Sequence, residues 1–194
     1  MPSSPHHDPT WLPPDLPIPE DDGAADHLPS RHIPSVSLPS TEGHPLDLGA
    51  LASQPLVLYV YPSMGRPGES PAPGWDETPG ARGCTPQSCA FRDRHGQFEE
   101  LGYSVAGLSA QTPEEQDEAA RRLGLTFPLL ADPTRRLDEA LRLPTFVIAG
   151  MTLYKRLTLI ADGQRVEKVF YPVFPPDENA GEVLEWIRGR SQSP

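Results

Sequence analysis

The sequence predicts an α/β domain with a mixed central β-sheet that is flanked by helices on both faces. Leu56–Tyr61 is a continuous apolar, β-branched run, typical of a strand buried on both faces. Strand-like and helix-like segments then alternate, which favours parallel strand–helix units. Near the C-terminal end, two extended segments joined by Asp162-Gly163-Gln164 predict an antiparallel β-hairpin. Parallel units followed by a hairpin give a mixed sheet.

Two short extended pieces precede the buried strand. Val36–Leu38 and His44–Leu48 surround the turn Ser40–Gly43 and predict a hairpin. After the strand, Pro62 ends the regular pattern, and the Gly- and Pro-rich stretch Ser63–Gly83 follows. Loops of this length inside a compact domain are uncommon and often functional.

A helix is expected next, with Thr85 as its N-cap and Pro86 at its first position. Phe91 and Phe98 give it an apolar side, and Gly102 ends it. The pattern therefore predicts one helix that starts directly after the first cysteine.

The remaining elements follow from local signals. Thr112–Glu115 is a capping box with proline at the first helical position, and Gly124 ends its helix. Asp132-Pro133 is expected to cap a helix that runs to Leu141. The other expected elements are strands at Tyr103–Leu108 and Phe127–Leu130, the hairpin strands Arg156–Ala161 and Arg165–Tyr171, and a helix at Asn179–Arg188.

Length and proline content predict one domain with tails. The chain has 194 residues, of which 26 are proline. Residues 1–33 are rich in proline and acidic residues, and we expect them to form a disordered or extended arm because they hold too few apolar side chains to offset the entropy of ordering. Residues 34–190 are the predicted domain, and residues 191–194 are a predicted disordered tail.

Charge and hydropathy exclude several classes of function. The formal net charge is −11 and the pI is about 4.9. Such a chain lacks the basic surface that binds nucleic acid or an anionic membrane. It also shows neither a membrane-spanning apolar run nor a secretory signal. We therefore expect a cytoplasmic protein without nucleic-acid or membrane partners.

The two cysteines carry the clearest chemical signal. Cys84 precedes a helix start, where unpaired N–H groups and the helix dipole favour the thiolate, the form of cysteine that attacks. Arg82 is close in sequence, and Arg156 is a candidate from a late strand. Cys89 lies five residues on, a helical rise of roughly 7.5 Å. That separation exceeds the Cα distance of a disulfide, up to about 6.8 Å, so a bond between them requires the first turn to unwind.

A metal site is the competing chemistry for these thiols. Cys84, Cys89 and His95 are three residue types that bind zinc. A fourth ligand is not evident, however, and helix geometry places Cys89 and His95 on different faces. The redox interpretation is therefore preferred, and no metal or bound cofactor is expected.

Several motifs in a fixed order carry a resemblance to a known family. Val57–Pro62 reads Val-Leu-Tyr-Val-Tyr-Pro, Thr78–Gly80 reads Thr-Pro-Gly, and Cys84–Asp93 reads Cys-Thr-Pro-Gln-Ser-Cys-Ala-Phe-Arg-Asp. Together with Phe127–Asp132 and Arg156–Gly163, these motifs resemble peroxiredoxins of the bacterioferritin-comigratory (Q-type) branch of the alkyl hydroperoxide reductase/thiol-specific antioxidant (redoxin) superfamily.

The resemblance covers about residues 33–190 and implies a thioredoxin-like fold and a thiol peroxidase acting on hydrogen peroxide or organic hydroperoxides. It implies that Cys84 is the peroxidatic cysteine and Cys89 the resolving cysteine of an intramolecular disulfide, which thioredoxin or a similar dithiol reduces. Arg156 matches the arginine that stabilises thiolate and peroxide, and Pro62 matches the proline that shields the thiolate's backbone donors. The expected oligomeric state is a monomer or a weak homodimer.

The sequence departs from the family pattern near Cys84. A long insertion separates Pro62 from Thr78, and Ala81 stands three residues before the cysteine where the family has Thr or Ser. The hydroxyl that orients peroxide is thus supplied by Thr78, by Thr85, or by neither. A second insertion covers Leu143–Lys155. These departures leave two alternatives open: a redox sensor or binding protein, and a thiol–disulfide oxidoreductase with little peroxidase activity.

Overall fold

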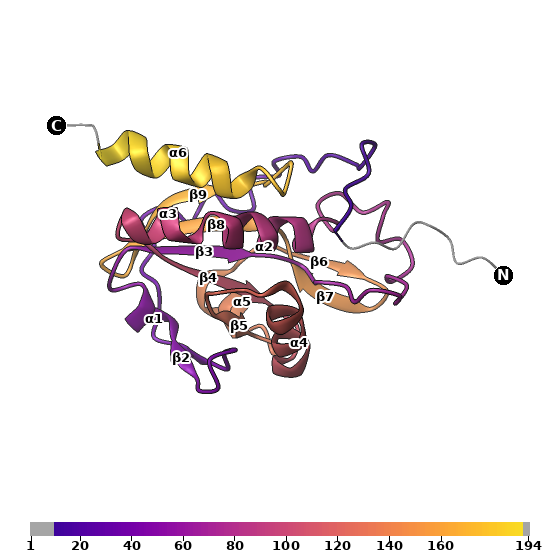
Figure 1. Cartoon of the computed structure of the whole chain (residues 1–194), viewed down its shortest axis with the longest axis horizontal. Helices are drawn as coiled ribbons and strands as arrows, with labels where there is room; N and C mark the ends of the chain where they lie inside the picture. The colour runs from indigo at the N-terminus through magenta and orange to yellow at the C-terminus, as the bar shows by residue number, and fades with distance from the viewer. Residues whose placement is uncertain (1–9, 192–194) are drawn as a thin grey trace.

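A computed structural model describes residues 10–191, and their core is one five-stranded mixed sheet (Figure 1). The strand order is β5-β4-β3-β8-β9. β3, β4 and β5 run parallel, while β8 pairs with β3 and β9 in antiparallel fashion. Their bounds are β3 Leu56–Val60, β4 Ser104–Ser109, β5 Leu129–Ala131, β8 Leu157–Asp162 and β9 Arg165–Phe170. The predicted mixed sheet is confirmed.

Helices cover both faces of this sheet, as predicted. Alternate side chains of β3 point to opposite sides, so Val57 and Tyr59 belong to one apolar cluster and Leu56 and Leu58 to the other. The first cluster is covered by four helices, α2 Cys84–Asp93, α3 His95–Glu100, α4 Pro113–Leu123 and α6 Asn179–Ser191. The second is covered by α1 Leu48–Leu51 and α5 Arg136–Leu141.

A close approach between β3 and β4 fixes α2 on the sheet. Tyr59 pairs in register with Gly107, and a side chain at Gly107 would meet the Tyr59 hydroxyl at 2.8 Å. The Tyr59 ring instead stacks on Phe91 of α2 with 4.5 Å between ring centroids, and its hydroxyl donates to Ser88. One glycine therefore makes room for the aromatic ring that holds the cysteine-bearing helix.

The predicted long helix after the first cysteine differs from the observed one. The observed segment consists of two helices, α2 and α3, which are separated at Arg94. α2 begins at Cys84 rather than after Thr85. Gly83 is the N-cap, with φ of 102°, and a side chain there would collide with Pro176. Thr85 therefore does not cap the helix, because the N-cap lies two residues earlier, where a residue without a side chain is needed.

The sequence signals for the start of α4 predicted its position more accurately. Thr112 and Glu115 form the predicted capping box of α4, and Gly124 ends that helix in a left-handed conformation. The Asp132 carboxylate accepts from the backbone N–H groups of Arg136 and Leu137 and so stabilises the start of α5, but the N-cap is Arg135 and the helix begins later than the predicted Asp132-Pro133 cap implies.

The hairpins account for the remaining strands. β1 Ser37–Leu38 and β2 Leu46–Asp47 form the predicted antiparallel pair. The insertion before Arg156 forms a second hairpin, β6 Thr145–Ile148 and β7 Met151–Tyr154. No strand was predicted there, because the segment lacks regular alternation.

The predicted boundary at residue 34 does not mark the edge of the packed structure. Ala25, Leu28 and Ile33 belong to the apolar core, and Ser30 donates its backbone N–H to Val166 of β9. These apolar side chains and backbone bonds order the second half of the expected arm. Residues 1–9 and 192–194 of the predicted arm and tail lie outside the described residues. Within residues 10–191, no helix is long and apolar enough to span a bilayer.

Candidate active site

A cavity of about 270 Å³ opens beside Cys84, at the N-terminus of α2. Its wall comes from the loop that follows β3, from the start of α2, from the start of α4 and from β7. Cys84 is only 3% exposed, so its sulfur lies at the base rather than on the rim. The thiol donates a weak hydrogen bond to the Ala81 carbonyl at 3.6 Å.

Arg156, directly before β8, brings a positive charge to this sulfur. Its Nη2 atom lies 3.2 Å from Cys84 Sγ. The same atom lies 3.0–3.2 Å from the backbone carbonyl oxygens of the Gly80–Arg82 turn. Arg156 is 3% exposed, so little solvent screens the charge from the sulfur. The predicted pair of Cys84 and Arg156 is thus brought into contact.

A buried polar network holds the guanidinium in place, and sequence reasoning missed it. Arg156 Nη1 donates to Gln87 Oε1 at 2.5 Å, and Gln87 Nε2 donates to Asn179 Oδ1 at 3.0 Å. Thr158 donates to the same Asn179 oxygen at 2.7 Å. Gln87 could have been singled out from the sequence, because it is a polar residue one turn after Cys84 on the same helix face. Asn179 gave none, because it reaches the site from α6.

Cys89 has a different environment on the same helix. Its side chain is partly buried and packs against the apolar cluster that contains Tyr59 and Phe91. Burial raises the pKa of the Cys89 thiol, and the Arg92 guanidinium partly opposes this effect. Both cysteines are free thiols inside an intact helix, which matches the expectation that the reduced form is helical here.

The three predicted peroxide-binding residues lie in different places. Thr85 is 2% exposed and lines the cavity beside Cys84. Pro62 is buried and directly precedes Ser63, which also lines the cavity. Thr78 does not line it, because its hydroxyl donates to the Gly74 carbonyl within the inserted loop.

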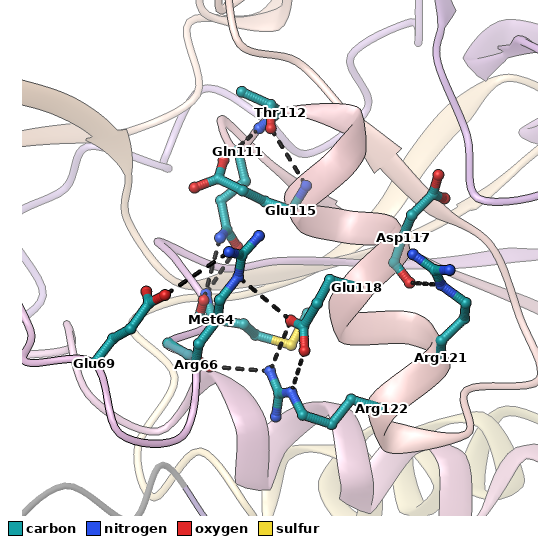
Figure 2. Close-up of polar contacts among 11 residues, drawn as sticks. Met64, Arg66, Glu69, Gln111, Thr112, Glu115, Asp117, Glu118, Arg121 and Arg122 are labelled. Carbon is teal, nitrogen blue, oxygen red and sulfur yellow. Dashed lines mark hydrogen bonds and ion pairs between the residues drawn. The ribbon is translucent and has the colours of Figure 1, made fainter.

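Hydrogen bonds and ion pairs join the inserted loop, Ser63–Gly83, to α4 and to Gln111 just before it (Figure 2). The backbone N–H of Met64 donates to Gln111 Oε1 at 2.8 Å, and Gln111 Nε2 donates back to the Met64 carbonyl at 3.2 Å. Figure 2 shows Arg66 between Glu69 and Glu118, at 3.7 and 3.8 Å. The cavity wall is therefore preformed. Neither Gln111 nor Met64 was singled out from the sequence.

The competing metal site lacks the geometry it needs. Across residues 10–191, no three His, Cys, Asp or Glu side chains are grouped closely enough to hold an ion. His95 bonds through Nδ1 to Thr126 Oγ1 at 2.8 Å and packs edge-on against Phe127, away from the two thiols.

Comparison with known proteins decides the family. The model of the Redoxin family matches residues 29–184. Peroxiredoxin Q, chloroplastic, of Sedum lineare is 31% identical over 156 residues, which are 80% of this chain and 75% of that protein. The chain is a Q-type peroxiredoxin of the redoxin family. Peroxiredoxin Q of Populus jackii is also 31% identical, over 80% of this chain and 65% of its own length.

Solved structures agree with this assignment. Peroxidoxin BcpB from Mycobacterium tuberculosis is 26% identical with a TM-score of 0.66, covering 84% of this peroxiredoxin and 98% of that chain. PrxQ of Xylella fastidiosa, 21% identical with a TM-score of 0.68 over 86% of this chain and 99% of its own, shows the same thioredoxin-like fold. The protein is therefore an oxidoreductase that acts on peroxides as a thiol peroxidase.

Proposed function

We propose that Cys84 is the thiol that attacks peroxide. The contact that carries this proposal is Arg156 Nη2 at 3.2 Å from Cys84 Sγ, at the base of a cavity. A fixed cation stabilises both the thiolate and the negative charge that develops on the leaving oxygen. The thiolate forms an S–O bond with the terminal peroxide oxygen while the O–O bond breaks. Cys84 becomes a sulfenic acid, and the other oxygen leaves as an alkoxide or hydroxide that takes up a proton.

Cys89 then resolves the sulfenic acid. Its sulfur attacks Cys84 Sγ, a disulfide forms, and the hydroxyl leaves as water. Five helical residues separate the two Cα atoms by roughly 7.5 Å, so the first turn of α2 must open for the bond to form. Gly83 precedes this turn as its N-cap, and the conformational freedom of glycine permits the backbone to change there.

Thr85 is our candidate for the hydroxyl that orients the peroxide. Ala81 has no hydroxyl, and the Thr78 hydroxyl already donates to the Gly74 carbonyl. Thr85, in contrast, lines the same cavity as Cys84. Pro62 stays in the proposal as the residue that shields the backbone near the sulfur, because it is buried next to the cavity wall.

A protein dithiol such as thioredoxin is the proposed reductant, because the Cys84–Cys89 disulfide needs two electrons to return to the thiols. The plant relatives are named as chloroplastic proteins. For this chain, a cytoplasmic location and a monomeric or weakly dimeric state stay predictions from the sequence.

Mass spectrometry of the reduced protein after one equivalent of hydrogen peroxide tests the pathway. The expected product is a Cys84–Cys89 disulfide, two hydrogens lighter than the dithiol. Cys89→Ser should instead stop at a sulfenic acid on Cys84 that a dimedone-type reagent traps. Unreacted thiols after a one-minute exposure to micromolar peroxide would refute the proposal and favour the sensor or binding protein. Rapid disulfide exchange without peroxide consumption would favour the thiol–disulfide oxidoreductase.

A further inference from the structure

The cavity beside Cys84 is much larger than hydrogen peroxide requires. A water molecule occupies about 30 Å³ of liquid, and a cavity of about 150 Å³ holds benzene. The cavity here measures about 270 Å³. Hydrogen peroxide would leave most of this volume to water, whereas a phenyl-sized group together with a hydroperoxyl group would fill it.

Part of the wall is apolar and comes from the two insertions. Trp75 belongs to the loop inserted after Pro62, and Met151 belongs to the β6–β7 hairpin. The other apolar lining residues are Met64, Pro71 and Ala72. The two insertions thus supply the apolar part of the wall of the cavity beside Cys84. These five apolar side chains stand beside polar lining residues such as Ser63, Thr85 and Gln111, a mixture that suits an organic group carrying a hydroperoxyl group.

The two arginines that line the cavity are already in ion pairs. Arg82 forms an ion pair with Asp76 at 2.7 Å. Arg66 lies between two glutamates, as Figure 2 shows, and Glu115 accepts from the Thr112 backbone in the capping box. Each lining arginine therefore already has a carboxylate partner, and the chain's charge of −11 also disfavours an anionic ligand.

The wall is also rigid enough to select a shape. The Met64–Gln111 amide pair fixes the start of the loop (Figure 2), and Arg122 donates to the Gly65 carbonyl at 3.0 Å. A preformed cavity loses little conformational entropy when a ligand enters, so its contacts count toward affinity.

We propose that the inserted loop and hairpin form a specificity pocket for neutral organic hydroperoxides with a compact aryl or alkyl group, and that Trp75 is its main specificity residue. This inference rests on the proposed reaction of Cys84. The thiolate takes the terminal oxygen of ROOH, and the O–O bond breaks. The alcohol ROH, formed when the alkoxide takes up a proton, leaves from the pocket lined by Trp75 and Met151.

Single-turnover oxidation of Cys84, followed by stopped flow, tests the pocket. The rate constants for cumene hydroperoxide and hydrogen peroxide are measured, and their ratio is compared among variants. Trp75→Ala should lower the ratio about tenfold, Met151→Ala about threefold, and Trp75→Phe should restore most of it. A cumene hydroperoxide bearing a carboxylate should react more slowly than the neutral compound.

Val147→Ala is the matched control. Val147 is another exposed apolar residue of the β6–β7 hairpin, 70% exposed, and it does not line the cavity. In the Val147→Ala variant, the ratio of the rate constants for cumene hydroperoxide and hydrogen peroxide should equal that of the unmodified protein. A Trp75→Ala ratio that also equals the unmodified one would overturn the specificity pocket while leaving the peroxidase intact. A Cys84 that reacts with neither peroxide would overturn the proposed function itself.

Discussion

Cys84 and Cys89 lie five residues apart on one helix, yet their surroundings differ in charge and polarity. Cys84 sits at the helix N-terminus with Arg156 Nη2 at 3.2 Å and a cavity in front of it. Cys89 packs against the apolar cluster that contains Tyr59 and Phe91, and burial raises the pKa of its thiol. Position on the helix, rather than the residue type, therefore determines which thiol can react first.

Exchanging the two thiols for serine should give the largest effect. Cys84→Ser should lower peroxide consumption at least about a thousandfold, because the oxygen nucleophile is far weaker than a thiolate. Cys89→Ser should keep the fast first oxidation of Cys84 and lose turnover with a thioredoxin system. Stopped-flow fluorescence and a coupled NADPH assay measure the two steps. Equal effects of both variants on the first oxidation would remove the distinction between the cysteines.

The arginines beside the two thiols allow a matched comparison. Arg156→Met should slow Cys84 oxidation about a hundredfold, the usual cost of removing a donor from a developing negative charge. Arg92→Met, which removes a cation near Cys89, should change that rate less than about twofold. Thermal unfolding checks the fold, because Arg156→Met also removes the guanidinium donor to the carbonyls of Gly80–Arg82. Similar rates for both variants would contradict a special role of Arg156.

The pH dependence of resolution should report the environment of Cys89. A thiol whose pKa is raised stays protonated at neutral pH, so the attacking thiolate is scarce. Disulfide formation should therefore accelerate as pH rises, up to about tenfold per pH unit below the pKa. Stopped flow after a fixed pulse of peroxide, from pH 6 to 9, measures this step. A flat profile would mean that helix opening, and not ionisation of Cys89, limits the rate.

Gln87 should give the smallest effect, because it acts through Arg156. Gln87→Leu removes the acceptor for Arg156 and the partner of Asn179, and should slow Cys84 oxidation about three- to tenfold. It should also destabilise the fold by about 1–3 kcal/mol. Gln87→Glu keeps the acceptor and should restore much of the rate. If both variants lose stability but keep the rate, Gln87 is purely structural.

Local patterns explain why much of the fold could be predicted. The capping box at Thr112, the buried run of β3 and the Asp162–Gln164 turn each act within a few residues, so their effects are visible in the sequence. The start of α2 was predicted wrongly, because the contact that decides it is not local. Gly83 caps it because Pro176 leaves no room for a side chain, and that neighbour is distant in sequence.

The family and the two cysteines could be predicted from the sequence alone, because each motif between Val57 and Gly163 is a short run of neighbouring residues. The residues that hold Arg156 beside the sulfur, and the packing of the expected arm, became visible only in the tertiary structure. Gln87 meets Arg156 across 69 positions and Asn179 across 92, and Leu28 and Ile33 of the expected arm enter the core. Such contacts depend on how the whole sheet packs, so no local pattern encodes them.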